Sequence, residues 1–95
     1  MNEPMTEEFL AALLKETSER HHAAFRSSDG DDPDWPSWYA AYLQAHLWDA
    51  AGRLPTRSEL TYLLVLAERA HAVSGTEEPW PEAYARTLLE GLRST

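Results

Sequence analysis

Apolar residues recur along most of this chain at the spacing of three and four residues that marks amphipathic helices, and no segment shows the alternation of a strand. The first helical segment begins at Thr6, a favourable N-cap residue that is followed by Glu7 and Glu8 at the positive end of the helix dipole. It extends to about Arg26. On a helical wheel, one continuous arc collects Phe9, Leu10, Leu13, Leu14, Thr17, His21, Ala24 and Phe25.

A polar turn rich in Asp follows at 27–34, where the chain is expected to reverse. The second helix should then begin at Trp35-Pro36, because proline suits the first position of a helix. Gly52 is a natural end for it. Its predicted inward face collects Tyr39, Ala40, Tyr42, Leu43, His46, Leu47 and Ala50.

A capping box that runs from Thr56 to Glu59 predicts the start of the third helix, over about residues 57–73. Its apolar positions almost encircle it, which predicts a central helix or one with a partner on a second side. These positions are Leu60, Leu63, Leu64, Val65, Leu66, Ala67, Ala70 and Val73. The fourth helix, over about 81–92, turns inward Tyr84, Ala85, Leu88, Leu89 and Leu92.

Four amphipathic helices with short connections predict an all-α fold, a four-helix antiparallel bundle that forms a single domain over 1–95. The second and fourth helices begin with the same sequence motif, Trp-Pro-x-x-Tyr-Ala-x-x-Leu, which starts at Trp35 and again at Trp80. A weaker echo, Glu-Arg-x-His, ends at His22 and at His71. Either the chain consists of two related helical hairpins, or a good helix opening arose twice.

Composition narrows the functional classes. A formal net charge of −8 disfavours nucleic-acid binding, because it repels phosphate backbones. The absence of cysteine excludes disulfides and thiolate chemistry. No apolar stretch is long enough to span a membrane, and no basic leader is present, so we expect a cytoplasmic protein. Neither a nucleophile elbow nor a glycine-rich phosphate loop occurs, so the sequence predicts no catalytic residue.

Histidines are candidates for metal or proton chemistry, because neutral imidazole serves both. His21, His46 and His71 fall on apolar arcs. In an up-down bundle His21 or His22 would meet His71 near acidic loops, which offers a possible metal set. The alternative, which we favour, is that each histidine is half-buried and hydrogen-bonded to a tyrosine or a backbone carbonyl. We therefore predict no metal and no cofactor.

Aromatic residues at the openings of the second and fourth helices supply a second hypothesis. Tryptophans and tyrosines beside histidines can hold a small aromatic or cationic ligand, or anchor a protein partner; alternatively, they fill the end of the core. The candidate ligand-binding residues are His21, His22, Trp35, Trp38, Tyr39, Tyr42, His71 and Tyr84. Trp48 lies off the main apolar arc and, with Val65, is the candidate interface for a dimer or a partner.

The stretch from His22 to Phe25, followed by Asp34-Trp35-Pro36-Ser37-Trp38-Tyr39-Ala40-Ala41-Tyr42, carries a resemblance. It is similar to a small bacterial helical segment that accompanies some proteins labelled as glyoxalase or bleomycin-resistance relatives, and the match covers about residues 19–43. The chain has no βαβββ unit of the glyoxalase type, so the metal-dependent chemistry of that label is not implied. The resemblance singles out His22 as a candidate for the rim of a pocket.

Taken together, these patterns predict a small acidic binding domain that acts as a homodimer or as an accessory to another protein. The alternative is a small-ligand or metal site, in its extreme form catalytic, at the end that holds His21, His22 and His71.

Overall fold

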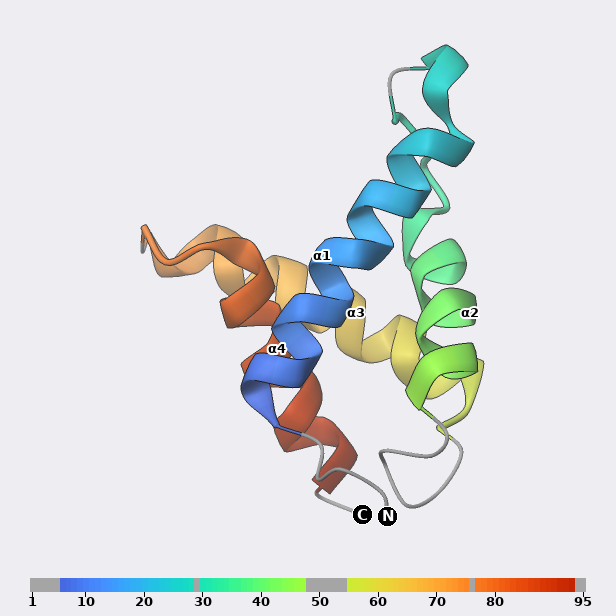
Figure 1. The fold of residues 1–95 in the computed structure, drawn as a ribbon. Helices are drawn as coiled ribbons and strands as arrows, with labels where there is room; N and C mark the ends of the chain where they lie inside the picture. Colours follow the sequence, from blue (N-terminus) through green and yellow to red (C-terminus); the bar gives the residue numbers. More distant parts are fainter. Residues whose placement is uncertain (1–5, 29, 48–54, 76, 94–95) are drawn as a thin grey trace.

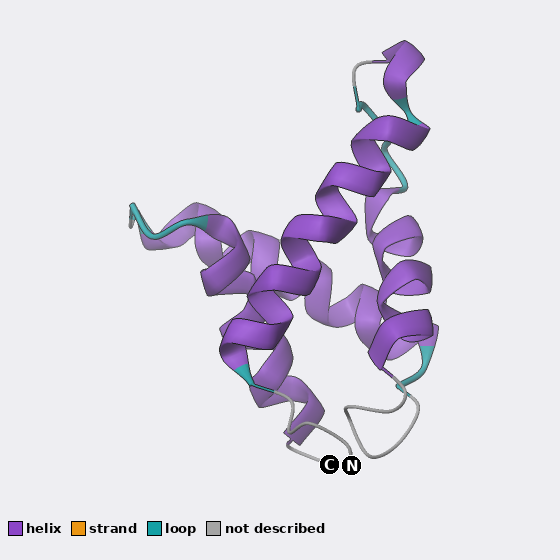
Figure 2. Cartoon of the chain, in the orientation of Figure 1, coloured by secondary structure: helices purple, strands orange, loops and turns teal. Residues whose placement is uncertain are grey.

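The computed structural model describes residues 6–28, 30–47, 55–75 and 77–93, and these residues are helical except at the connections (Figures 1 and 2). The helices are α1 (Glu7–Ala24), α2 (Trp35–Leu47), α3 (Arg57–Ser74) and α4 (Trp80–Arg93), with a short 3-10 turn η1 (Arg26–Ser28) after α1. The described residues contain no strand. The predicted all-α four-helix bundle is confirmed.

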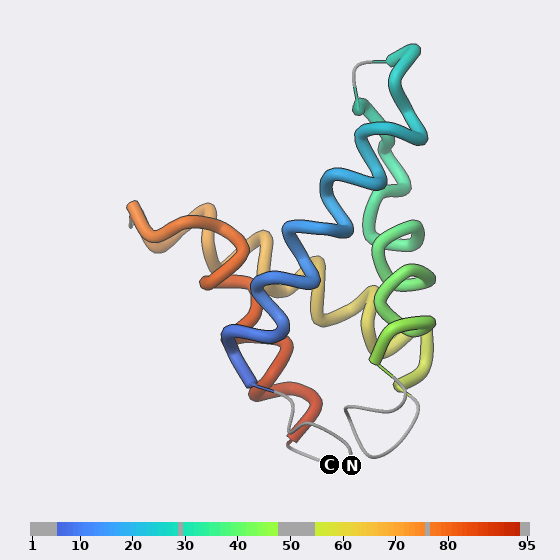
Figure 3. Tube along the Cα trace, in the orientation of Figure 1, coloured from blue at the N-terminus to red at the C-terminus, as the bar shows by residue number. Residues whose placement is uncertain are grey.

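Each helix packs on the one before it, and α4 closes the ring by packing extensively on α1. The tube view shows α1 and α2 running in opposite directions as a hairpin, whereas α3 crosses their direction and α4 turns back from its end (Figure 3). The α1–α2 connection and the α3–α4 connection therefore point away from each other (Figure 1). This divergence separates the two connections, which a straight up-down bundle would have brought to one end.

Leucines fill the core. The side chains of α1 to α4 that are completely buried include Leu10, Leu14, Leu43, Leu47, Leu60, Leu64 and Leu88. Burial of each such side chain contributes about 1.5–3 kcal/mol, so this cluster supplies most of the drive to pack the four helices. Trp35, Trp38, Tyr42, Trp80 and Tyr84 pack against the cluster but are only partly buried.

The helix starts follow the sequence signals. The Thr6 hydroxyl oxygen accepts a hydrogen bond from the Phe9 amide, and the Thr56 hydroxyl oxygen accepts one from the Glu59 amide, each at 3.0 Å. Gly75 ends α3 in the left-handed conformation, with a φ of 67° that glycine adopts at little cost. The end predicted for the second helix, with Ala50 and Gly52, lies outside the described residues.

Several residues predicted to face inward are exposed. Phe9 and Ala24 lie near the two ends of α1, and Val73, which is 84% exposed, lies near the end of α3. His46 is exposed as well, because it stacks on Tyr42 instead of entering the core. Leu66 and Ala70 are exposed on α3, so this helix is not buried on all sides. Of the two alternatives, a central helix is wrong, and a helix with a partner on a second side stays a prediction.

No described helix combines the length and the apolar composition that crossing a membrane requires.

Candidate functional site

The repeated Trp-Pro-x-x-Tyr openings of α2 and α4 form the same local structure. Within each opening the tryptophan and the tyrosine are four residues apart, so they lie on one face of the helix. The ring centroids of Trp35 and Tyr39 are 5.1 Å apart at an interplanar angle of 80°, and those of Trp80 and Tyr84 are 5.1 Å apart at 71°. Both pairs are edge-to-face contacts, the arrangement that aromatic quadrupoles prefer. The repeat is thus one of geometry as well as of sequence.

The two aromatic pairs line a single open hollow of about 320 Å³, which we call the aromatic groove. Side chains from all four helices form it: Ser18 of α1, Trp35 and Tyr39 of α2, Glu68 of α3, and Trp80 and Tyr84 of α4. Tyr39 is almost buried, whereas both tryptophans and Tyr84 are half-buried. Each pair therefore packs on the core with one side and borders the hollow with the other.

The groove keeps its tyrosines protonated. Burial, together with the negative charge of Glu68 and the nearby Tyr39, raises the pKa of Tyr84 to about 12. Burial also raises the pKa of Tyr39, although a hydrogen bond from Ser18 acts in the opposite direction. At neutral pH both phenols are hydrogen-bond donors with no tendency to lose a proton. Glu68 is the one charged side chain among the described residues that line the groove.

A second hollow of about 300 Å³ adjoins the groove and shares Ser18, Trp35 and Tyr39 with it. Its other walls come from the end of α1 and from the connection to α2. They are His21, His22, Gly30, Asp31 and Asp32. Gly30 is required here, because its φ is 84° and a Cβ atom would lie 2.7 Å from Nδ1 of His22.

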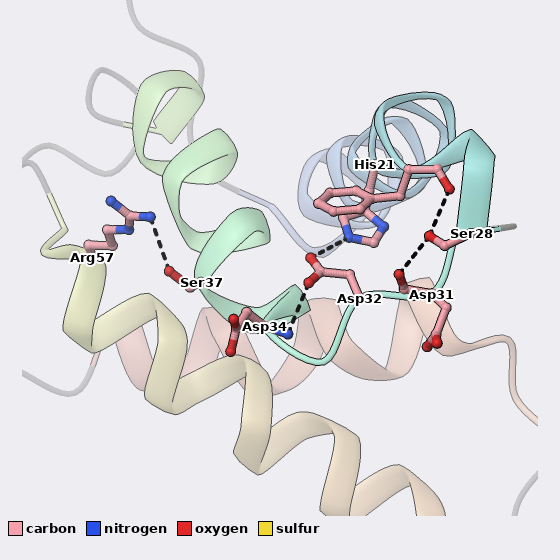
Figure 4. A network of polar contacts seen from close by, with 8 residues as sticks. His21, Ser28, Asp31, Asp32, Asp34, Ser37 and Arg57 are labelled. Carbon is pink, nitrogen blue, oxygen red and sulfur yellow. Dashed lines mark hydrogen bonds and ion pairs between the residues drawn. The ribbon is translucent and has the colours of Figure 1, made fainter.

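The α1–α2 connection is tied to α1 through His21 (Figure 4). Nε2 of His21 donates to the carboxylate of Asp32 at 3.0 Å, and both side chains are largely buried. The other carboxylate oxygen of Asp32 accepts from the Asp34 amide at 3.0 Å. The Ser28 hydroxyl also lies within hydrogen-bonding distance of the Asp31 carbonyl oxygen, at 2.9 Å. The acidic turn is thus anchored by one of its carboxylates.

His71 ties the second connection in a different way. Its Nε2 donates to the backbone carbonyl of Glu78 at 3.0 Å, and its ring meets the ring of Tyr84 at a centroid distance of 6.1 Å. It lines a separate hollow of about 160 Å³ with Glu78 and Arg86, which form an ion pair. This pairing lowers the pKa of the Glu78 carboxyl. A half-buried histidine bonded to a carbonyl is what the favoured sequence interpretation described.

The remaining predicted residues, Trp38 and Tyr42, lie outside the groove. Their rings stack at a centroid distance of 5.7 Å, and Tyr42 also stacks on His46 at 4.4 Å. The Tyr42 hydroxyl donates to Glu16. Of the eight candidate ligand-binding residues, Trp35, Tyr39 and Tyr84 line the groove, and His21 and His22 line the adjoining hollow. Their role in binding stays a prediction.

Three groove residues are not among the candidate ligand-binding residues chosen from the sequence: Ser18, Glu68 and Trp80. Trp80 carries a signal that would have included it, because it is the counterpart of Trp35 in the repeat. Ser18 and Glu68 carry no such signal. They reach the groove only because α1 and α3 approach α2 and α4 there, which depends on how the helices cross.

A larger hollow, of about 520 Å³, lies between the first turns of α1 and α4. It has an alanine floor, Ala11 and Ala12, and its other walls are Pro81 and the charged side chains Glu7, Glu8, Lys15 and Glu82. Among the described residues, no aromatic side chain lines it, and three of its four charged side chains belong to the first turns of α1 and α4. We therefore place the candidate site at the aromatic groove despite its smaller volume.

Within the described part of the chain, no three His, Asp or Glu side chains are grouped so as to hold a metal ion. Of the predicted interface, Trp48 lies outside the described residues and Val65 of α3 is half-buried. Beside Val65, α3 exposes Tyr62 at 65%, Leu66 at 41% and Val73.

Comparison with known proteins adds no relative: no family model, no curated protein and no solved structure matches the chain. The resemblance of residues 19–43 to the segment that accompanies glyoxalase-like proteins stays a prediction.

Proposed function

We propose that this chain is a binding module that recognises a partner protein through the aromatic groove. The observation that carries this proposal is the pairing of two Trp–Tyr units, from α2 and α4, around one open hollow. Tryptophan and tyrosine are the residues most enriched at the centres of protein interfaces, because they bury a large area with few rotatable bonds.

The composition of the core supports this assignment. The completely buried large side chains are predominantly leucines, and the tryptophans of the groove lie around them rather than among them. Trp35 and Trp80 pack against this core, but part of each side chain remains exposed. A partially exposed aromatic side chain that borders a hollow can still gain burial when a partner covers it, at about 25 cal/mol per Å² of apolar area.

The protonation state of the groove favours recognition over proton transfer. A general base needs a pKa near the working pH, and the pKa of Tyr84 is raised to about 12. Tyr39 and Tyr84 are therefore suited to donate hydrogen bonds to a partner. We expect the module to work in the cytoplasm and, given its net charge of −8, with a protein rather than a nucleic acid.

Selection from a random peptide library, followed by NMR mapping of the selected peptides on the ¹⁵N-labelled protein, tests the proposal. We expect selected peptides to shift the indole N–H signals of Trp35 and Trp80. Trp80→Leu should weaken them by tenfold or more, whereas Trp38→Leu, which removes a tryptophan outside the groove, should leave their affinity within about twofold. Peptides that bind equally well to Trp80→Leu would refute the groove as the binding surface.

Self-association is a second candidate, because Tyr62, Leu66 and Val73 are exposed and share one face of α3. Pairing of this face with the same face of a second copy would bury it, in line with the dimer predicted around Val65 and Trp48. Sedimentation of the protein over a range of concentrations tests this proposal. We expect a dimer that Leu66→Glu dissociates and that Glu90→Gln leaves intact; a monomer at all concentrations would rule it out.

A further inference from the structure

We propose that the aromatic groove receives the cationic side chain of a lysine or arginine in a basic segment of the partner protein. This inference rests on the proposed function, since it names the chemistry of the partner that the groove would bind.

The walls of the groove suit a cation. The rings in each pair stand nearly at right angles, at 80° for Trp35 and Tyr39 and at 71° for Trp80 and Tyr84, so the four rings present differently directed walls. A cation within about 6 Å of a tryptophan or tyrosine face is attracted by the ring quadrupole, and the attraction grows when water is excluded. Several rings around one hollow add their contributions. Two tryptophans are favourable here, because tryptophan is the strongest partner for a cation.

The charges around the groove also favour a cationic side chain. Glu68 lines it, and the adjoining hollow adds Asp31 and Asp32, of which Asp32 is engaged with His21. Among the described residues, no lysine or arginine lines either hollow. The hollow at His71 differs, since Arg86 supplies a positive charge there. The effect of Glu68 on the pKa of Tyr84 indicates that its negative charge is felt inside the groove.

An acidic or phosphorylated partner fits these surroundings poorly. Its anion would meet Glu68 with no cation among the described lining residues to compensate, and the net charge of −8 would oppose its approach. A purely apolar side chain would cover the rings but leave the Glu68 carboxylate without a partner as it lost water, which carries a cost. A side chain with an apolar stem and a cationic head avoids both problems, because the stem contacts the rings while the head reaches the carboxylate.

The test uses two synthetic peptides that differ only in charge: glycine-spaced lysines, and the same peptide with norleucine in place of each lysine. Each is titrated into the ¹⁵N-labelled full chain, and the indole N–H signals of Trp35 and Trp80 are followed, with Trp38 as the internal reference. We expect the lysine peptide to shift the two groove signals and to bind at least fivefold more tightly than the norleucine peptide. Affinity should fall about tenfold in Trp80→Leu and about threefold in Glu68→Gln. Glu90→Gln, which removes the same charge from an exposed site on α4, should leave the affinity unchanged.

Three results would overturn the inference, and they differ in what they say about the proposed function. If library peptides without basic residues bind the groove while the lysine peptide does not, the groove is a binding surface for another chemistry. If the lysine peptide shifts signals across the acidic surface and Trp80→Leu does not weaken it, the attraction is a diffuse effect of net charge. If no peptide of any composition shifts Trp35 or Trp80, both the inference and the proposed function are wrong.

Discussion

The two helical hairpins of this molecule use the same helix opening but close their connections differently. In each, a histidine near the end of the first helix reaches across the connection and holds it. His21 donates to the largely buried carboxylate of Asp32, whereas His71 donates to the backbone carbonyl of Glu78. The sequence echo aligns His71 with His22, but in the structure the residue that acts like His71 is His21. The repeated sequence motif therefore determines the local geometry of the aromatic rings, but it does not determine which histidine forms the hydrogen bond across the connection.

The largest difference between the hairpins should appear when these histidines are removed. His21→Leu leaves a buried oxygen of Asp32 without its donor, which we expect to destabilise the fold by about 2–3 kcal/mol. His71→Leu removes the hydrogen bond to the backbone carbonyl of Glu78, which lies in a half-buried position. This change should destabilise the fold by about 1 kcal/mol or less. Urea denaturation of the two variants measures both values.

A second change separates the buried carboxylate from the loss of packing around His21. Adding Asp32→Asn to His21→Leu removes the charge but keeps an oxygen that can accept from the Asp34 amide. We expect this double variant to regain part of the lost stability. Equal costs for His21→Leu and His71→Leu, with no recovery in the double variant, would show that the two ties are equivalent.

The next comparison concerns one register position of the repeat, which is His46 in α2 and Gly91 in α4. His46 is exposed, whereas Gly91 packs so closely on α3 that a Cβ atom would lie 2.4 Å from a methyl carbon of Leu63. Gly91→Ala should therefore destabilise by about 1 kcal/mol, because the buried Leu63 has to move. At an open helical position the same change would stabilise by a similar amount.

Shortening the Leu63 side chain should reverse the sign of the effect that Gly91→Ala has on stability. In a Leu63→Ala background, Gly91→Ala no longer meets a methyl group, so its helix propensity should dominate and the substitution should stabilise the fold. Thermal or urea unfolding of the four proteins in this cycle gives the coupling. Purely additive effects would indicate that α3 and α4 separate easily at this point.

Much of the fold follows from the sequence. The features that could not be predicted from it all have the same cause. The spacing of Leu10, Leu14, Leu43 and Leu64 predicted buried faces that the structure confirms, and the caps at Thr6 and Thr56 form as expected. These features depend on residues a few positions apart, where helical geometry is fixed.

Crossing angles depend on how side chains from distant parts of the chain interlock, and periodicity does not encode them. This is why a straight bundle misplaced His71 relative to His21, and why the sequence left open whether α3 is central or has a partner on a second side. The site was affected in the same way. Trp35, Tyr39 and Tyr84 were identified from their local pattern, but Glu68 comes from α3 and joins them only through the packing of the four helices.

The smallest expected effect concerns the two tyrosines of the groove. Glu68→Gln should lower the pKa of Tyr84 from about 12 toward its ordinary value of 10.0 without reaching it, because burial, the largest cause of the shift, is unchanged. A phenol whose pKa is raised by folding stabilises the folded state fully below its unfolded pKa, and this stabilisation is lost as the pH rises through the folded pKa. Stability linked to Tyr84 should thus decline between about pH 10 and 12, and in Glu68→Gln the decline should end at a lower pH.

NMR titration of ¹³C-labelled tyrosine follows this ionisation directly, with Tyr84→Phe to assign the signal and Glu90→Gln to control for the loss of one negative charge. The comparison with Tyr39 sharpens the result, because Glu68 is not among the causes of the raised pKa of that tyrosine. A shift in Tyr84 alone would mean that Glu68 acts mainly on the α4 side of the groove, where a cation held against Trp80 would feel it most. Equal shifts in both tyrosines would mean that its field fills the groove, and no shift in either would remove the electrostatic support for a cationic partner.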